Sequence, residues 1–130
     1  MFNHIMIGTN DIDAAKAFYE KVLKVLGAEG SMENTLESGT RRVFFMHDGN
    51  ILALSQPIDG EPATCANGMT IGFKCSSPEQ VKELHDVAVA AGGTSIEDPP
   101  GLREGAMGAM HLSYFRDLDG HKLCGIHRAG

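Results

Sequence analysis

The side chains best suited to chemistry in this sequence are His4 and Cys124, which lie on predicted strands near its two ends. A histidine that faces a cavity would act as a base or orient a substrate by hydrogen bonding. The alternative is a partly buried histidine whose nitrogens are satisfied by the backbone. The cysteine would be a thiolate nucleophile or a soft metal ligand, although a small buried hydrophobe is the more common role for such a residue. We therefore treat both as catalytic candidates.

Polar side chains that could hold a substrate occur on other predicted strands. Arg42 and Arg116 sit near corresponding positions of two hairpins, and either guanidinium could bind a substrate carboxylate through two parallel hydrogen bonds. Solvated surface is the common alternative for an arginine. Thr70 would offer a hydroxyl to a substrate oxygen, or it reflects only the preference of threonine for strands.

Other candidates depend on which face of a strand they occupy. His111 and Tyr114 lie on opposite faces of one predicted strand, so one of them should face the cavity, and the sequence leaves open which. Met6 belongs to a set of methionines that would either line an adaptable apolar pocket or fill the core. The other histidines are predicted at turns, edges or the surface, and no pair of histidines has the helical i, i+4 spacing of a metal site: His47, His85, His121 and His127.

Two similar hairpins carry many of these residues. The segment from Tyr114 to Ile126 has an apolar strand, an Asp-Gly turn in which Gly120 can adopt positive φ, and an alternating second strand. The segment Val43–Leu54 repeats this pattern around Gly49. The sequence therefore predicts the same hairpin twice.

The repeat extends into the segments before the hairpins. Gly27 and Gly93 end two predicted amphipathic helices and are 66 positions apart, as are His4 and Thr70. Each copy reads as a strand, a helix and three strands. Such a unit cannot cover both faces of its own sheet, but two units can place helices outside and leave a concave inner surface for a small molecule.

We therefore predict an α+β fold, with two βαβββ modules that form a cupped mixed sheet and helices on the outside. The whole chain, 1–130, is predicted to be one domain. Module one covers about 1–57, a linker rich in Pro and Gly covers about 58–67, and module two covers about 68–130. The Pro/Gly-rich range 98–108 is predicted as a long loop.

Composition limits the possible partners. The chain has 130 residues, a formal net charge of −6 and no extended basic cluster, which argues against binding to nucleic acid or to anionic membranes. No apolar run is long enough for a membrane-spanning helix, and no secretory signal is visible. Three widely spaced cysteines fit free thiols in a reducing compartment. We predict a cytoplasmic protein with a small-molecule ligand.

At this level the chain resembles the vicinal oxygen chelate superfamily, which includes glyoxalase I, the bleomycin and fosfomycin resistance proteins and the extradiol dioxygenases. The segments that carry the resemblance are His4–Ile7, Ala17–Leu23, Thr70–Phe73 and Tyr114–Cys124. The resemblance implies paired βαβββ modules and commonly a homodimer. It is specific for the fold and weak for the reaction, because this fold supports several chemistries.

The resemblance also implies where a metal would bind. Family members typically take ligands from the first and last strand of each module, and those positions hold His4, Ala53, Thr70 and Cys124. Only His4 is a usual ligand, so the standard metal centre is predicted to be lost. No cofactor is predicted, and a divalent metal remains an alternative.

Three functional hypotheses follow. In the first, the protein is a lyase or isomerase acting on a small carbonyl or oxygenated metabolite. His4 would be the base, Thr70 and Cys124 would line the site, and an arginine would hold the charge of the substrate. In the second, it is a metal-independent binding protein that sequesters an apolar or aromatic compound between subunits, as drug-resistance proteins do. In the third, it is a metal-dependent lyase or dioxygenase in which another histidine, such as His111, joins His4 and Cys124 as a ligand.

Overall fold

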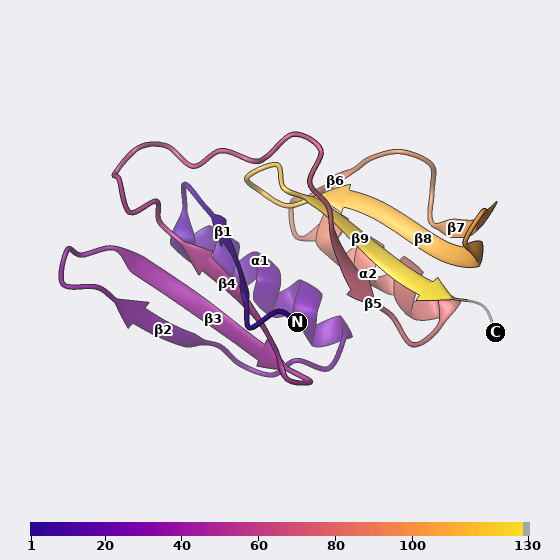
Figure 1. Ribbon diagram of the computed structural model, residues 1–130, viewed down its shortest axis with the longest axis horizontal. Helices are drawn as coiled ribbons and strands as arrows, with labels where there is room; N and C mark the ends of the chain where they lie inside the picture. The colour runs from indigo at the N-terminus through magenta and orange to yellow at the C-terminus, as the bar shows by residue number, and fades with distance from the viewer. Residues whose placement is uncertain (129–130) are drawn as a thin grey trace.

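The computed structural model describes residues 1–128, which form two helices and two mixed sheets (Figure 1). The predicted α+β class is confirmed. In chain order the elements are β1 (Ile5–Gly8), α1 (Ile12–Val25), β2 (Met32–Thr35), β3 (Arg41–His47), β4 (Asn50–Ser55), β5 (Ile71–Lys74), α2 (Pro78–Ala90), β6 (Thr94–Ser95), β7 (Gly101–Gly105), β8 (Gly108–Arg116) and β9 (Lys122–Arg128). None of the helices in this part of the chain is both long and apolar enough to cross a membrane.

The two sheets share one topology. The first sheet has the strand order β1-β4-β3-β2, and the second has the order β5-β9-β8-β6, with β7 also paired to β8. In each sheet the strand before the helix pairs in parallel with the last strand of that half, so β1 pairs with β4 and β5 with β9. The remaining pairs are antiparallel. This is the arrangement expected from a repeated strand, helix and hairpin.

Local sequence sets where both helices begin. The Asp11 carboxylate accepts a hydrogen bond from the amide of Ala14 at 3.0 Å, and the Ser77 hydroxyl accepts one from the amide of Gln80 at 3.1 Å. Each interaction satisfies a backbone N–H that the first turn leaves free. Pro78 is the first residue of α2. A backbone N–H at this position has no acceptor within the helix, so the proline removes no hydrogen bond.

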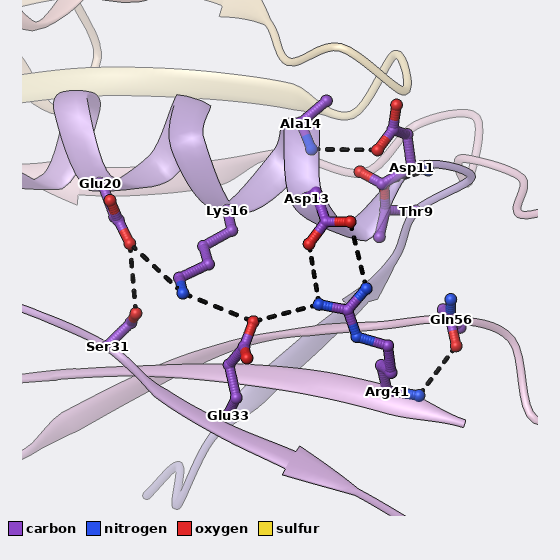
Figure 2. Close-up of polar contacts among 10 residues, drawn as sticks. All are labelled: Thr9, Asp11, Asp13, Ala14, Lys16, Glu20, Ser31, Glu33, Arg41 and Gln56. Atoms are coloured by element: carbon purple, nitrogen blue, oxygen red, sulfur yellow. Dashed lines mark hydrogen bonds and ion pairs between the residues drawn. The ribbon is translucent and has the colours of Figure 1, made fainter. Parts of the chain in front are cut away.

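An ion-pair network holds α1 against strands of the first sheet (Figure 2). Both terminal nitrogens of Arg41 donate to Asp13 on α1, at 3.1 and 2.8 Å, and one of them also reaches Glu33 on β2 at 3.3 Å. Lys16 approaches the same Glu33 carboxylate at 3.4 Å. The hydrogen bonds and the charge of Arg41 lower the pKa of Asp13. Because these side chains are partly exposed, the network orients the helix more than it stabilises the fold.

The hydrophobic core lies between the helices and one face of each sheet. Both helices lie behind the sheets in Figure 1, and the opposite sheet faces carry no helix. The two helices also contact each other, so one buried cluster extends across both halves. Its largest fully buried side chains include Phe18, Tyr19, Leu54, Leu84, Phe115 and Leu123.

The predicted loop at 98–108 is partly wrong, because residues Gly101–Gly105 form β7 and β8 begins at Gly108. Gly108 has a φ of +95°, which lets the chain reverse tightly and pair β7 with β8. The prediction that His85 is exposed is also wrong. Its side chain is buried on the inner face of α2, and its Nε2 lies 2.8 Å from the Ser95 hydroxyl.

The buried thiol of Cys75 gives a testable dependence of stability on pH. Burial raises the pKa of this thiol from 9.0 to about 11. The folded state therefore binds the proton more tightly than the unfolded chain. The resulting stability is fully present below pH 9 and is lost as the pH rises towards 11, by roughly 2 kcal/mol.

Denaturant unfolding measured from about pH 8 to 11 should show this loss in the wild type. The Cys75→Ala variant should have a flatter profile over the same interval. Cys65→Ala is the matched control, because the Cys65 thiol is exposed, and its profile should follow that of the wild type. Equal slopes for the wild type and Cys75→Ala would contradict the assignment.

Candidate functional site

A cavity of about 450 Å³ lies where the segment before β5 meets the β8–β9 hairpin. It is open, and most of its lining residues are exposed. Its position brings together the connection between the two halves, the start of β5 and the last turn of the chain. The lining residues are Cys65, Ala66, Asn67, Gly68, Met69, Thr70, Arg116, Gly120 and Lys122.

Two cationic side chains lie on one wall of the cavity. Arg116 ends β8 and Lys122 begins β9, and the two residues are direct partners in the antiparallel ladder. Directly opposite residues in such a ladder share a sheet face. One terminal nitrogen of Arg116, Nη1, donates to the carbonyl oxygen of Gly120 at 2.7 Å, which fixes the guanidinium beside the turn. The other N–H groups of Arg116 have no protein acceptor within the described residues, so they can meet a ligand.

Lys122 is held from two sides. Its ammonium forms an ion pair with the carboxylate of Glu97 and lies 4.7 Å from the centre of the Tyr114 ring. The face of the Tyr114 ring and the carboxylate of Glu97 both attract the Lys122 ammonium. Sequence reasoning missed Lys122 because an isolated lysine on a strand looks like solvated surface. The sequence did contain one indication of its role, because Lys122 lies directly across the predicted turn from Arg116.

Tyr114 and Cys124 also pair directly in this ladder, two residues from Arg116 and Lys122 along their strands. They therefore lie on the same sheet face as Arg116 and Lys122. Burial raises the pKa of the Cys124 thiol, whereas a hydrogen bond with Tyr114 and the charge of Lys122 oppose that rise. Burial also raises the pKa of Tyr114, and Cys124 adds to this effect. Both groups therefore keep their protons near neutral pH. In this state Cys124 is a thiol and Tyr114 can donate a hydrogen bond.

The turn that carries the cavity wall is anchored to the first half of the chain through Asp117. The hydroxyl of Tyr19 on α1 donates to Asp117 Oδ2 at 2.5 Å. Asp117 Oδ1 accepts from the amides of Asp119 and His121 at 3.0 and 2.9 Å. Burial, followed by the negative charge of Asp117, raises the pKa of Tyr19 well above its usual value of 10.0, so the phenol stays protonated as a donor.

A second anchor lies at the end of β1. The Nε2 atom of His121 donates to the carbonyl oxygen of Gly8 at 2.7 Å, and Asp119 accepts from the amide of Asn10 at 2.9 Å. His121 was predicted to lie at a turn, an edge or the surface. The expected exposure is wrong, because the side chain is only 4% exposed. Its partner is 113 residues away in the chain, so local sequence gave no indication of the contact.

The candidate residues of the second half therefore lie together. Thr70 and Arg116 line the cavity, and Tyr114 and Cys124 follow on the same sheet face. The sequence left open whether His111 or Tyr114 faces the cavity. Tyr114 lies on the same sheet face as Arg116 and Lys122. His111 has the opposite orientation, beside His127, and its Nδ1 is buried without a hydrogen-bond partner.

The candidate residues of the first half lie outside this cavity. His4 precedes β1 and is exposed, with its Nδ1 at 2.7 Å from the Asn3 side-chain oxygen. Met6 is half-buried on β1 and pairs with Ala53. The Nε atom of Arg42 donates to the Ser55 hydroxyl across the β3–β4 pair at 3.2 Å. The structure does not bring these three residues to Thr70 and Arg116.

The residues at the four strand positions implied by the resemblance do not fit a divalent metal ion. Ala53 offers no donor and Thr70 offers only a hydroxyl, which leaves His4 and Cys124, fewer than the three protein ligands that such a site requires. Within residues 1–128 no three His, Cys, Asp or Glu side chains gather as a metal site would require. His111, the proposed additional ligand, also has the opposite orientation to Cys124. We therefore derive no step through a metal.

Two helix-backed mixed sheets with matching topology define the class of protein, an α+β fold built from repeated strand-helix-hairpin units. The chain belongs to the Glyoxalase/Bleomycin resistance protein/Dioxygenase superfamily, whose family model matches residues 1–124. This result confirms the family resemblance of the sequence.

Solved structures agree with this assignment. The chain is similar to a glyoxalase/bleomycin resistance protein from Albidiferax ferrireducens T118, with 43% identity, a TM-score of 0.90, and coverage of 98% of this chain and 99% of that one. A glyoxalase-related enzyme from Fulvimarina pelagi shares the fold at 21% identity and a TM-score of 0.71, with coverage of 97% and 86%. No protein with a curated description matches the chain. The family is therefore established, whereas the comparisons name no reaction for this chain.

Proposed function

We propose that the protein binds a small oxygenated metabolite carrying a carboxylate, with Arg116 as the anchor. The observation that carries this proposal is the joint placement of Arg116, Lys122 and Thr70 on one cavity. A volume of about 450 Å³ lies within the usual size range of small-molecule sites. This proposal keeps the binding hypothesis from the sequence but changes its ligand, from an apolar or aromatic compound to an oxygenated anion.

The chemistry of the wall supports this ligand class. The free N–H groups of Arg116 can meet both oxygens of a carboxylate, which is the geometry that a guanidinium favours. The hydroxyl of Thr70 can donate to, or accept from, an adjacent hydroxyl or carbonyl oxygen of the ligand. A 2-hydroxy or 2-oxo acid places these two groups on neighbouring carbons. An aromatic or aliphatic compound without charge would leave the guanidinium unused.

A lyase or isomerase reaction is a second candidate, favoured by the Tyr114–Cys124 pair beside the cavity. The protonated hydroxyl of Tyr114 could stabilise charge that develops on a ligand oxygen, and this role needs no metal. The role of His4 as the base remains a prediction, because this residue lies on the first half of the chain, outside the cavity.

The homodimer and the cytoplasmic location also remain proposals. Apolar side chains exposed on or beside the first sheet support an association between copies, since they would be covered in a dimer. They are Met32 and Met46, which lie on one face of this sheet, and Phe2 before β1.

Binding of lactate and of its neutral amide, lactamide, tests the proposed function. The two compounds have nearly the same shape and differ by one negative charge. In NMR titrations at about pH 7, lactate should shift the amide signals of Thr70, Arg116 and Gly120, whereas lactamide should bind much more weakly. Arg116→Gln should weaken lactate binding about tenfold, because a charge-assisted contact is lost.

Arg42→Gln is the matched control for this experiment. It removes the same charge from the first sheet, away from the cavity lining, and should leave lactate affinity unchanged. Equal binding of lactate and lactamide would overturn the proposal. The same conclusion would follow if Arg42→Gln and Arg116→Gln had the same effect.

A further inference from the structure

Glu97 is not one of the residues that line the cavity, but its carboxylate contacts Lys122, which is. Glu97 lies in the connection between β6 and β7 and forms an ion pair with Lys122. The Lys122 side chain is 26% exposed and the Glu97 side chain is 47% exposed, so the pair lies at the rim rather than in the core. The contact therefore joins the β6–β7 connection to the first residue of β9.

The backbone of Glu97 adopts a conformation that glutamate rarely takes. Its φ is +57°, and in residues 1–128 Asp48 is the only other non-glycine residue with positive φ. A left-handed conformation is unfavourable for a residue such as glutamate, because its Cβ atom comes too close to the backbone carbonyl oxygen. Asp48 lies in a tight hairpin turn that explains its conformation, whereas Glu97 follows the short strand β6. At Glu97 the unfavourable φ coincides with the placement of its carboxylate on Lys122.

This contact changes the charge that a ligand meets. The charged residues in the cavity lining are Arg116 and Lys122, which together carry two positive charges. Glu97 neutralises one of them, so the cavity presents the net charge of a single cation. The Tyr114 ring holds the same ammonium 4.7 Å from its centre, which keeps Lys122 at the wall independently of Glu97.

We propose that Glu97 sets the charge specificity of the cavity, so that it accepts ligands with one negative charge and disfavours ligands with two. This inference rests on the proposed function. One carboxylate is matched by Arg116. A second carboxylate would have to take Lys122 from Glu97 and would meet the negative charge of Glu97 nearby. Glu97 is thus a specificity-determining residue that need not touch the ligand.

Three probes of one skeleton test this proposal. Lactamide, lactate and tartronate are 2-hydroxy compounds with zero, one and two negative charges near neutral pH. Their affinities should be measured by NMR titration at constant ionic strength, because exposed charges are screened by salt. For the wild type we expect tartronate to bind no more tightly than lactate.

The Glu97→Gln variant keeps the size of the side chain and removes its charge. It should raise tartronate affinity about fivefold and lactate affinity less, so the ratio of the two affinities shifts towards the dianion. Glycine adopts positive φ without strain, so the Glu97→Gly variant should shift the affinity ratio in the same direction. Agreement between the two variants would separate the effect of charge from that of backbone conformation.

The neighbouring carboxylate provides the control. Asp98→Asn changes the net charge of the same loop by the same amount, but Asp98 forms no ion pair with Lys122, and the affinity ratio should stay at the wild-type value. If lactate binds and the ratio is unchanged in both Glu97 variants, the specificity proposal is wrong and the proposed function stands. If none of the probes binds the wild type or Glu97→Gln, the proposed function itself is wrong.

Discussion

Replacing Asp117 with alanine is expected to lower the free energy of unfolding by about 4 kcal/mol. The Asp117 carboxylate is 5% exposed and accepts hydrogen bonds from Tyr19, Asp119 and His121. Its removal leaves the Tyr19 hydroxyl buried without an acceptor and frees the turn that carries one wall of the cavity. Urea unfolding followed by circular dichroism measures the loss. The same variant should also bind lactate more weakly.

Asp119→Ala is the appropriate comparison for this prediction. Asp119 lies in the same turn but is only half-buried, and its carboxylate accepts one hydrogen bond, from the amide of Asn10. Its loss should cost about 1 kcal/mol or less. Similar costs for the two variants would mean that the buried contact between Asp117 and Tyr19 is not what holds the turn in place.

Replacing Gly93 with alanine is expected to cost about 3 kcal/mol through overpacking. A Cβ atom at this position would lie 2.7 Å from the carbonyl oxygen of Arg116 and 2.9 Å from that of Ala88. Both are backbone atoms, which cannot rotate away as a side chain can. The chain must therefore shift either at the end of α2 or at the end of β8. Thermal unfolding of the variant measures the cost.

Gly105→Ala is the control for the Gly93 prediction. A Cβ atom at Gly105 would meet no other heavy atom within 4 Å, and this glycine does not have positive φ, so alanine should be tolerated there. Because Arg116 belongs to the backbone that Gly93→Ala displaces, that variant should also bind lactate less well. A Gly93→Ala protein as stable as Gly105→Ala would contradict the close packing of Gly93 on β8.

The fold could be predicted from the sequence because its determinants are local and occur twice. Gly49 and Gly120 both have positive φ in tight turns, and the apolar stripes of the two helices face the sheets. The strand β7 was missed because a segment after two prolines carries no strand pattern of its own. It becomes a strand only through pairing with β8.

The site was less accessible to sequence reasoning. Thr70, Arg116, Tyr114 and Cys124 come together in the second half of the chain, and for the last three the hairpin register fixes a shared face. Glu97 could not be found, because it lies in an irregular connection and no local pattern indicates its contact with Lys122. The wall formed by residues 65–69 also has no periodic signal, because it belongs to an irregular connection.

The anchoring of the last turn has a consequence for how the protein is made. The bonds from this turn to Tyr19, Asn10 and Gly8 span 98, 109 and 113 residues. Loop closure over such distances is slow, and it becomes possible only after the turn at residues 117–121 has been synthesised. We therefore expect the two halves to melt in a single cooperative transition, with the C-terminal hairpin completing the native state last.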